Sequence, residues 1–142
     1  MEEIREVIEG KAALLQEGDA KAILSHYAPG YVEFSLAPPL RQPVDGQTPA
    51  ALDAWMAGFE APPRREVTQL EITADGDVAF ATSLDRLTAV PRGSTEGFTL
   101  WFRVTLGLRR VDGRWLVTHE HESVPFEMDG SFRASTGLTP TG

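Results

Sequence analysis

The sequence contains no cysteine among its 142 residues. Disulfides, thiolate nucleophiles, cysteine-bound zinc and iron–sulfur clusters are therefore excluded. The absence of cysteine also fits the cytoplasm, where we expect the protein to be. Histidine is scarce too, since the chain has only three.

Positive charge is also in short supply. The chain has 13 Lys and Arg against 21 Asp and Glu, which gives a net charge of −8. Nucleic acid would be repelled, because the only basic clusters are the pairs Arg64-Arg65 and Arg109-Arg110. No run approaches the ~18 apolar residues of a membrane span, and the acidic start is unlike a signal peptide. We expect neither a nucleic-acid partner nor a membrane.

Helical patterns come first in the chain. Apolar residues recur at helical spacing over residues 2–17, which predicts an amphipathic helix. Gly18 is a typical helix stop, and Asp19 is a suitable N-cap for the next helix. We expect that second helix to carry Tyr27 and to end before Pro29.

A third helix and several strands follow. Thr48 with Pro49 after it is a strong helix start, and this helix is expected to run to about Phe59. Alternating or β-rich segments predict five strands, over residues 31–37, 66–73, 78–90, 98–111 and 114–124.

This order of elements predicts one domain of the α+β class. A helix, a helix, a strand and a helix precede four long antiparallel strands, with no linker between them. Three N-terminal helices would cover one face of a curved, cone-shaped antiparallel sheet. The open end of such a cone is a natural ligand pocket.

The last strand, WLVTHEHESVPF, holds two of the three histidines. Strand alternation puts His119 and His121 on the same face as Trp115 and Val117. That face has the larger apolar side chains, so we expect it to point inward. The opposite face would then point to solvent or to a partner subunit. It would carry Leu116, Thr118, Glu120 and Glu122.

The neighbours of these histidines depend on the hairpin register. If Asp112-Gly113 is a two-residue turn, His119 lies beside Leu106 and His121 lies beside Val104. Both histidines would then sit in an apolar wall.

A three-residue loop would change the parity. With Gly113 as a bulge, Arg103 and Thr105 join His119 and His121 on the inner face. An Arg-x-Thr pattern within an apolar strand favours this arrangement. The competing interpretation pairs Arg103 with a glutamate on a solvated face.

A metal site is the third possibility for the histidines. Gly113-x5-His119-x-His121 matches the opening of a cupin metal motif, but the carboxylate that should follow falls at Pro125 or Phe126. We therefore expect no metal. No G-x-S-x-G elbow or Gly-rich phosphate loop is present, and no cofactor is expected.

A ligand pocket remains the favoured interpretation, although aromatic residues at this spacing are often plain core. The ligand would be small, and either apolar or carboxylate-bearing. The candidate ligand-binding residues are Tyr27, Phe34, Trp55, Trp101, Arg103, Thr105, His119 and His121.

Two patterns resemble a known superfamily. They are G-D-x3-I-x3-Y-A-x3-V from Gly18, and R-x-T-x7-G-x-W-x-V-x-H-x-H-x-S-x-P from Arg103. Together they resemble the SnoaL-like, nuclear transport factor 2-like superfamily, in its ketosteroid isomerase homologue branch. The resemblance implies a cystatin-like α+β barrel over residues 1–127 and a homodimer packed through the sheet. Residues 128–142 would be a mobile or partner-contacting tail.

The resemblance also bears on chemistry. The general-base aspartate of the steroid isomerases would fall at Ser35, and their oxyanion tyrosine near Lys11, so neither group is supplied. The resemblance therefore implies a ligand-binding domain without that Asp/Tyr pair. The alternative is a cofactor-free isomerase, cyclase or dehydratase. It would use His119 or His121 as base with Arg103 as anion clamp.

Overall fold

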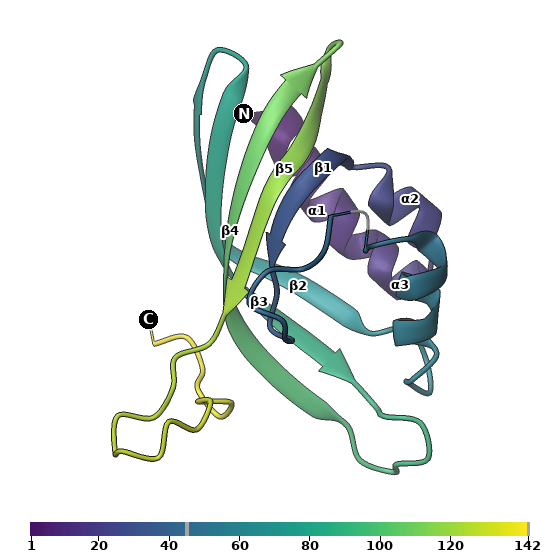
Figure 1. Ribbon diagram of the computed structural model, residues 1–142, viewed down its shortest axis with the longest axis vertical. Helices are drawn as coiled ribbons and strands as arrows, with labels where there is room; N and C mark the ends of the chain where they lie inside the picture. The colour runs from purple at the N-terminus through teal and green to yellow at the C-terminus, as the bar shows by residue number, and fades with distance from the viewer. Residues whose placement is uncertain (45, 142) are drawn as a thin grey trace.

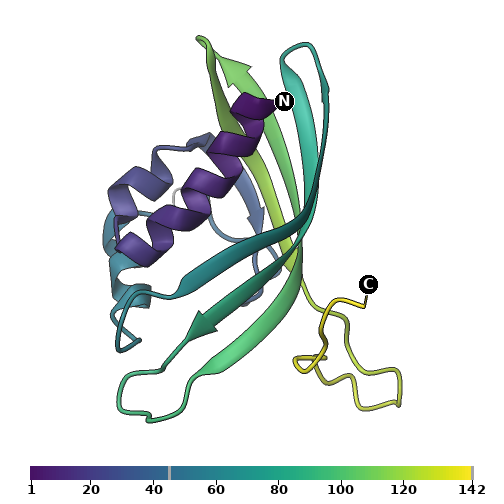
Figure 2. The same ribbon diagram turned by 180° about the vertical axis from the view of Figure 1, so that it is seen from behind.

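Three helices lie on one side of a curved five-stranded sheet (Figures 1 and 2). The computed structural model describes residues 1–44 and 46–141. The strand order is β1-β5-β4-β3-β2; β1 and β5 are parallel and the other pairs antiparallel. The predicted α+β class is confirmed. The elements are α1 (Glu2–Glu17), α2 (Ala20–Leu24), β1 (Tyr27–Phe34), α3 (Pro49–Met56), β2 (Arg64–Asp75), β3 (Val78–Ala89), β4 (Phe98–Val111) and β5 (Arg114–Ser123).

The junction between α1 and α2 is formed as the sequence predicts. Gly18 has a φ of +71°, and its N–H is donated to the carbonyls at the end of α1. The side chain of Asp19 then accepts a 3.0 Å hydrogen bond from the N–H of Ala22. No helix in the described part of the chain is long and apolar enough to cross a membrane.

Two helix ends differ from the prediction. The second helix ends at Leu24, and Tyr27 opens β1 instead of lying on the helix. Pairing with β5 starts here, because the N–H of Val117 is donated to the carbonyl of His26 at 2.8 Å. The third helix ends at Met56, short of Phe59, which forms a bridge with a loop. In both places tertiary pairing overrides local helix propensity.

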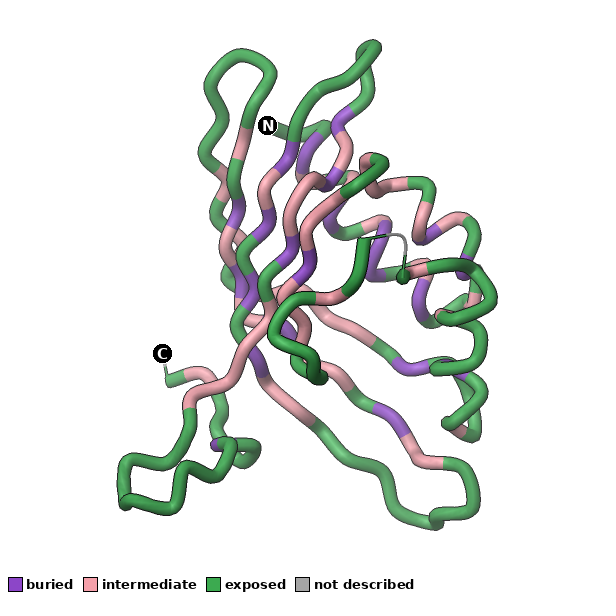
Figure 3. Tube along the Cα trace, viewed as in Figure 1, coloured by how far each residue is buried: buried purple, intermediate pink, exposed green. Residues whose placement is uncertain are grey.

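The core lies between α1 and the inner face of the sheet. Ile4 and Ile8 of α1 are almost completely buried against apolar residues of β3, β4 and β5. A second cluster packs the end of α1 against α2 and Met56 of α3. Buried and more exposed positions alternate along the central strands (Figure 3). Each strand therefore has a buried face toward the helices and an outer face.

A bulge in β5 changes the orientation of the histidine strand. Val111 faces Arg114, as the two-residue turn predicts, and Leu108 still pairs with Val117. The next pair is Gly107 with His119, so Thr118 is an extra residue.

The extra residue overturns the predicted alternation of β5. Trp115, Val117 and then Glu120 face inward, and Glu120 is only 2% exposed. The prediction that His119 and His121 share the inner face is wrong. So is the prediction that Glu120 and Glu122 point to solvent or to a partner.

The C-terminal tail leaves the sheet and forms a small separate arm (Figures 1 and 2). It folds back on itself through a bridge between Phe126 and Ala134, and the buried Ser135 donates its N–H to the carbonyl of Pro125 at 2.7 Å. The expected tail includes Gly142, which lies outside the described residues. That the tail is mobile or contacts a partner stays a prediction.

Candidate functional site

A cavity of about 590 Å³ lies between the helices and the inner face of the sheet. This volume is in the range that accommodates a drug-sized organic molecule. One part of the wall is apolar and aromatic, and it includes Leu52, Trp55 and Phe98. The rest carries several charged side chains, most of which are buried.

Glu120 is the centre of this charged group. Its Oε1 accepts a 2.6 Å hydrogen bond from the hydroxyl of Tyr27 and lies 3.4 Å from Nζ of Lys11. Lys11 comes from α1 and Tyr27 from β1, so the contact joins three elements. The side chains of Lys11 and Glu120 are only 5% and 3% exposed. A pair this deeply buried depends on both partners being present.

Arg65 of β2 links Glu120 to two more carboxylates. Its Nε lies 2.7 Å from Oδ2 of Asp85, and its Nη1 lies 3.2 Å from Oε2 of Glu122. The same Nη1 is 3.8 Å from Oε2 of Glu120. Ser83 donates its hydroxyl to Asp85 at 2.7 Å. These contacts fix the guanidinium in the cavity wall.

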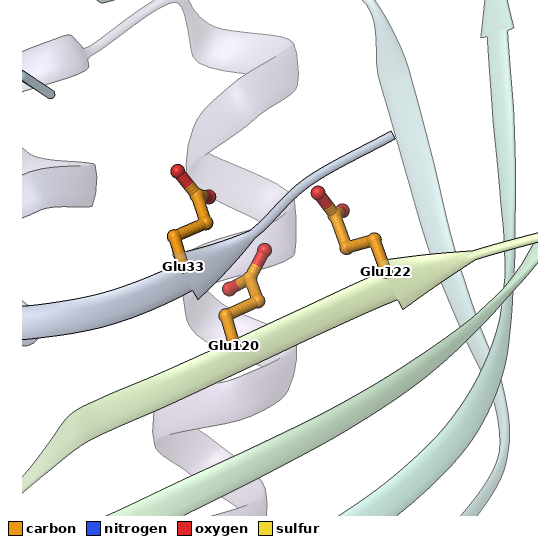
Figure 4. A group of neighbouring side chains, drawn as sticks. All are labelled: Glu33, Glu120 and Glu122. Carbon is orange, nitrogen blue, oxygen red and sulfur yellow. The ribbon is translucent and has the colours of Figure 1, made fainter. Parts of the chain in front are cut away.

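Three carboxylates meet at this wall and are called the carboxylate cluster below: Glu33, Glu120 and Glu122. Their side chains extend from β1 and β5 to the same side of the sheet (Figure 4). One oxygen of each lies within 4.8 Å of the others, a spacing that would suit a cation. Lys11 and Arg65 already supply positive charge here. Glu33 is contacted by Gln47, whose amide donates to Oε2 at 3.0 Å.

The carboxyl groups of the cluster differ in the direction of their pKa shifts. Burial favours the neutral form of Glu120, but Lys11 and Arg65 outweigh it, and the pKa falls well below the usual 4.5. Burial and the charge on Glu120 raise the pKa of Glu122 to about 7. The same two causes raise the pKa of Glu33. At neutral pH, the carboxyl of Glu120 is therefore charged, whereas that of Glu122 is divided between its protonated and charged forms.

The tyrosines at the cavity remain protonated. Burial, followed by the negative charge of Glu120, raises the pKa of Tyr27 well above its ordinary value. Burial and the charge of Glu33 raise that of Tyr31. Both hydroxyls can therefore act as hydrogen-bond donors, and Tyr27 already donates to Glu120.

Two of the eight predicted ligand-binding residues line the cavity, namely Tyr27 and Trp55. Phe34 is on the outer face, with its ring edge-on to the rings of His119 and His121 at 5.1 and 5.5 Å. Nδ1–H of His119 is donated to the carbonyl of Val32 at 2.8 Å. These side chains form their own cluster, away from the carboxylates.

The other three predicted residues come from β4. Arg103 and Thr105 do share a face with His121, as the second register predicts, but it is the outer face. Arg103 is exposed, and its Nε donates to Ser123 at 3.2 Å. It lines a small outer cavity of about 150 Å³, together with Trp101 and the end of the tail.

The sequence contains signals that point to the buried charges. Lys11 lies on the apolar stripe of α1, three residues after Ile8 and four before Leu15. Asp85 lies on the inward face of an alternating strand. A charge at an apolar position indicates a buried ion pair. Glu120 gave no such signal, because its direction depends on the bulge at Thr118.

Comparisons with known proteins agree with this architecture. The chain is 32% identical to an NTF2-like protein of unknown function from Pseudomonas putida KT2440, with a TM-score of 0.83 over 98% of this chain and 95% of that one. A nuclear transport factor 2 (NTF2-like) superfamily protein from Salmonella enterica serovar Typhimurium LT2 is 17% identical, with a TM-score of 0.77 over 92% and 94%. An NTF2-like protein with a cystatin-like fold from Novosphingobium aromaticivorans is 18% identical, with a TM-score of 0.70 over 92% and 82%.

A search of curated proteins found no match. The model of the SnoaL-like domain family matches residues 4–127, which include all of the carboxylate cluster. The chain therefore belongs to the SnoaL-like family, within the nuclear transport factor 2-like superfamily.

Proposed function

We propose that the protein binds a small organic ligand in its inner cavity. The observation that carries this proposal is a cavity of about 590 Å³ with an apolar, aromatic part and a charged part. Such a wall would hold the body of the ligand by burial and orient its polar end by hydrogen bonds. Ser35 and Lys11 occupy the positions where the aspartate and the tyrosine of the steroid isomerases would fall, and both line the cavity. The ligand would thus be bound without that Asp/Tyr pair.

Narrowing the cavity should weaken ligand binding. Ala51 and Ala54 are both exposed on α3, but only Ala51 lines the cavity. With the neutral fluorescent dye Nile red as probe, we expect saturable binding by the native protein. Ala51→Trp should weaken it roughly tenfold, which corresponds to about 1.4 kcal/mol. The matched control Ala54→Trp should leave it unchanged.

Absence of saturable dye binding by the native protein would contradict the proposal. So would equal effects of the two tryptophan variants. Native mass spectrometry of the purified protein complements the dye, since a retained organic ligand adds its mass to the folded species.

We also propose that two copies pair through the outer face of the sheet. The protein's own helices leave this face uncovered, and Phe80 on it is 53% exposed. The same native spectra test this proposal. A mass of two chains is expected, and a spectrum of single chains alone would reject it.

A second candidate function is a cofactor-free acid–base enzyme of the isomerase, cyclase or dehydratase type. It is favoured by Glu122, whose pKa of about 7 suits proton transfer at neutral pH. The roles first considered for His119, His121 and Arg103 would pass to the carboxylate cluster, because those three side chains are not at the cavity wall.

This candidate predicts proton exchange at carbon. In D₂O, Glu122 would abstract a proton next to a ketone carbonyl and return a deuteron from solvent. A panel of ketones followed by NMR should reveal exchange that Glu122→Gln slows about a hundredfold. The control Glu71→Gln, on the exposed edge strand β2, should not slow it. Exchange that is unaffected by Glu122→Gln would exclude this role.

A further inference from the structure

The cavity wall carries more negative than positive charge. Glu33, Glu120 and Glu122 contribute three carboxylates, while Lys11 and Arg65 are the cations that line the cavity with them among the described residues. Arg65 also pairs with Asp85 at 2.7 Å, so its charge is shared among three carboxylates. Both Lys11 and Arg65 lie close to Glu120. The protein's own cations therefore do not neutralise the whole group.

Glu33 is the carboxylate with the least support. It is only 8% exposed, yet the described chain places no Lys, Arg or His nitrogen within 4.0 Å of it. Its Oε2 accepts from Gln47, and Oε1 has no hydrogen-bond donor in the same part of the chain. Oε1 is not among the fully buried atoms, so it is accessible from the cavity and can accept a hydrogen bond from a ligand there.

The remaining wall suits the rest of such a ligand. The rings of Trp55 and Phe59 are 5.2 Å apart, and Phe98 continues the same aromatic surface. Tyr31 also lines the cavity, with its ring centroid 4.4 Å from that of Tyr27. Aromatic faces attract cations as well as apolar groups.

We propose that the ligand of this cavity is a protonated amine with an apolar or aromatic body, whose ammonium binds between Glu33 and Glu122. This inference rests on the proposed ligand-binding function and names the class of its ligand. The ammonium would donate to the free oxygen of Glu33 and would add the positive charge that the wall lacks. A carboxylate-bearing ligand, which the sequence left open, would be repelled by the same groups.

Three probes with one phenyl body and different end groups test this proposal. They are 4-phenylbutylamine, 4-phenylbutan-1-ol and 4-phenylbutanoate, each measured by displacement of Nile red at pH 8. The amine should bind roughly tenfold more tightly than the alcohol, because a charge-assisted hydrogen bond is stronger than a neutral one. The carboxylate should bind most weakly.

A matched pair of variants locates the effect. Glu33→Gln keeps the size of the side chain and removes its charge, so it should abolish the preference for the amine over the alcohol. Glu71→Gln, on exposed β2, should change neither. Circular dichroism of both variants checks that the fold is retained.

Affinity for the amine should also rise with pH. The groups facing Glu122 are Lys11 from α1, Tyr27, Tyr31 and Glu33 from β1, Arg65 from β2 and Glu120 from β5. Asp85 from β3 pairs with Arg65. With a pKa of about 7, Glu122 is mostly protonated at pH 6 and mostly charged at pH 8. Because the charged form is the competent one, amine affinity should increase by up to about tenfold over this range. Alcohol affinity should not.

The outcomes separate the two proposals. Equal affinities for the alcohol and the amine would overturn the amine proposal but would leave the proposed ligand-binding function intact. A preference for the amine that persists in Glu33→Gln would also overturn it, as would displacement of the amine by millimolar Mg²⁺. Failure of the dye and of every probe to bind would reject the proposed function itself.

Discussion

Replacing Glu120 with alanine should cost about 3 kcal/mol of unfolding free energy, the largest loss expected for any single residue of the site. The substitution leaves the ammonium of Lys11, 5% exposed, without its partner at 3.4 Å. It also removes the acceptor for the Tyr27 hydroxyl at 2.6 Å. Truncating one member of a buried pair is costly because the other charge stays buried. Urea unfolding at pH 7 measures the loss.

Two controls identify the cause of this loss. Glu71→Ala removes a glutamate from an exposed position on β2 and should change stability by less than about 0.5 kcal/mol. The double variant Lys11→Met, Glu120→Leu removes both charges and should recover most of the loss, since an apolar pair can replace a buried ion pair. Equal effects of Glu120→Ala and Glu71→Ala would show that the pair contributes nothing.

The stabilisation from Glu120 should disappear in acid. Its pKa in the folded protein lies below the ordinary 4.5, so the folded state favours the charged form. A group of this kind stabilises fully above pH 4.5 and loses its contribution as the pH falls through the folded pKa. The difference in stability between the native protein and Glu120→Gln should therefore shrink between pH 5 and pH 2.

The sequence predicts the fold better than the site. Helical spacing, Gly18 and Asp19 act over a few residues, so the ends of α1 and the start of α2 can be predicted from local chemistry. The number of long strands follows from alternation in the same way. The early start of β1 at Tyr27 could not be predicted, because it depends on pairing with β5, which is distant in the sequence.

The prediction of which side chains form the site failed because of a single residue. Alternation along β5 is correct up to Val117, and one bulge at Thr118 then exchanges the faces of the histidines and the glutamates. Nothing in THEHES marks which residue is extra, because a bulge is set by both strands of the pair and by the curvature of the sheet. The buried cations were open to prediction, since Lys11 lies on the apolar stripe of α1. A buried lysine requires an acid, and that requirement would have favoured inward-facing glutamates.

Replacing Glu122 with glutamine should stabilise the protein at pH 8, by on the order of 1–3 kcal/mol. The raised pKa of Glu122, about 7 against the ordinary 4.5, means that the folded state disfavours its charged form. A carboxyl of this kind is most compatible with the fold below pH 4.5. As the pH rises from 4.5 through 7, ionisation of this carboxyl lowers the free energy of unfolding. Glutamine has no proton to lose, so the variant avoids that penalty.

The loss of a partner for Arg65 should not cancel this gain. The guanidinium keeps Asp85 at 2.7 Å and Glu120 at 3.8 Å. Urea unfolding of the native protein and of Glu122→Gln at pH 5, 6, 7 and 8 measures the effect. The two curves should separate as the pH rises, whereas Glu71→Gln, at an exposed position of β2, should run parallel to the native protein. A stability difference that does not depend on pH would place the pKa of Glu122 in its ordinary range. Glu122 would then be charged throughout this pH range, which would remove the basis for the acid–base role and for the rise of amine affinity with pH.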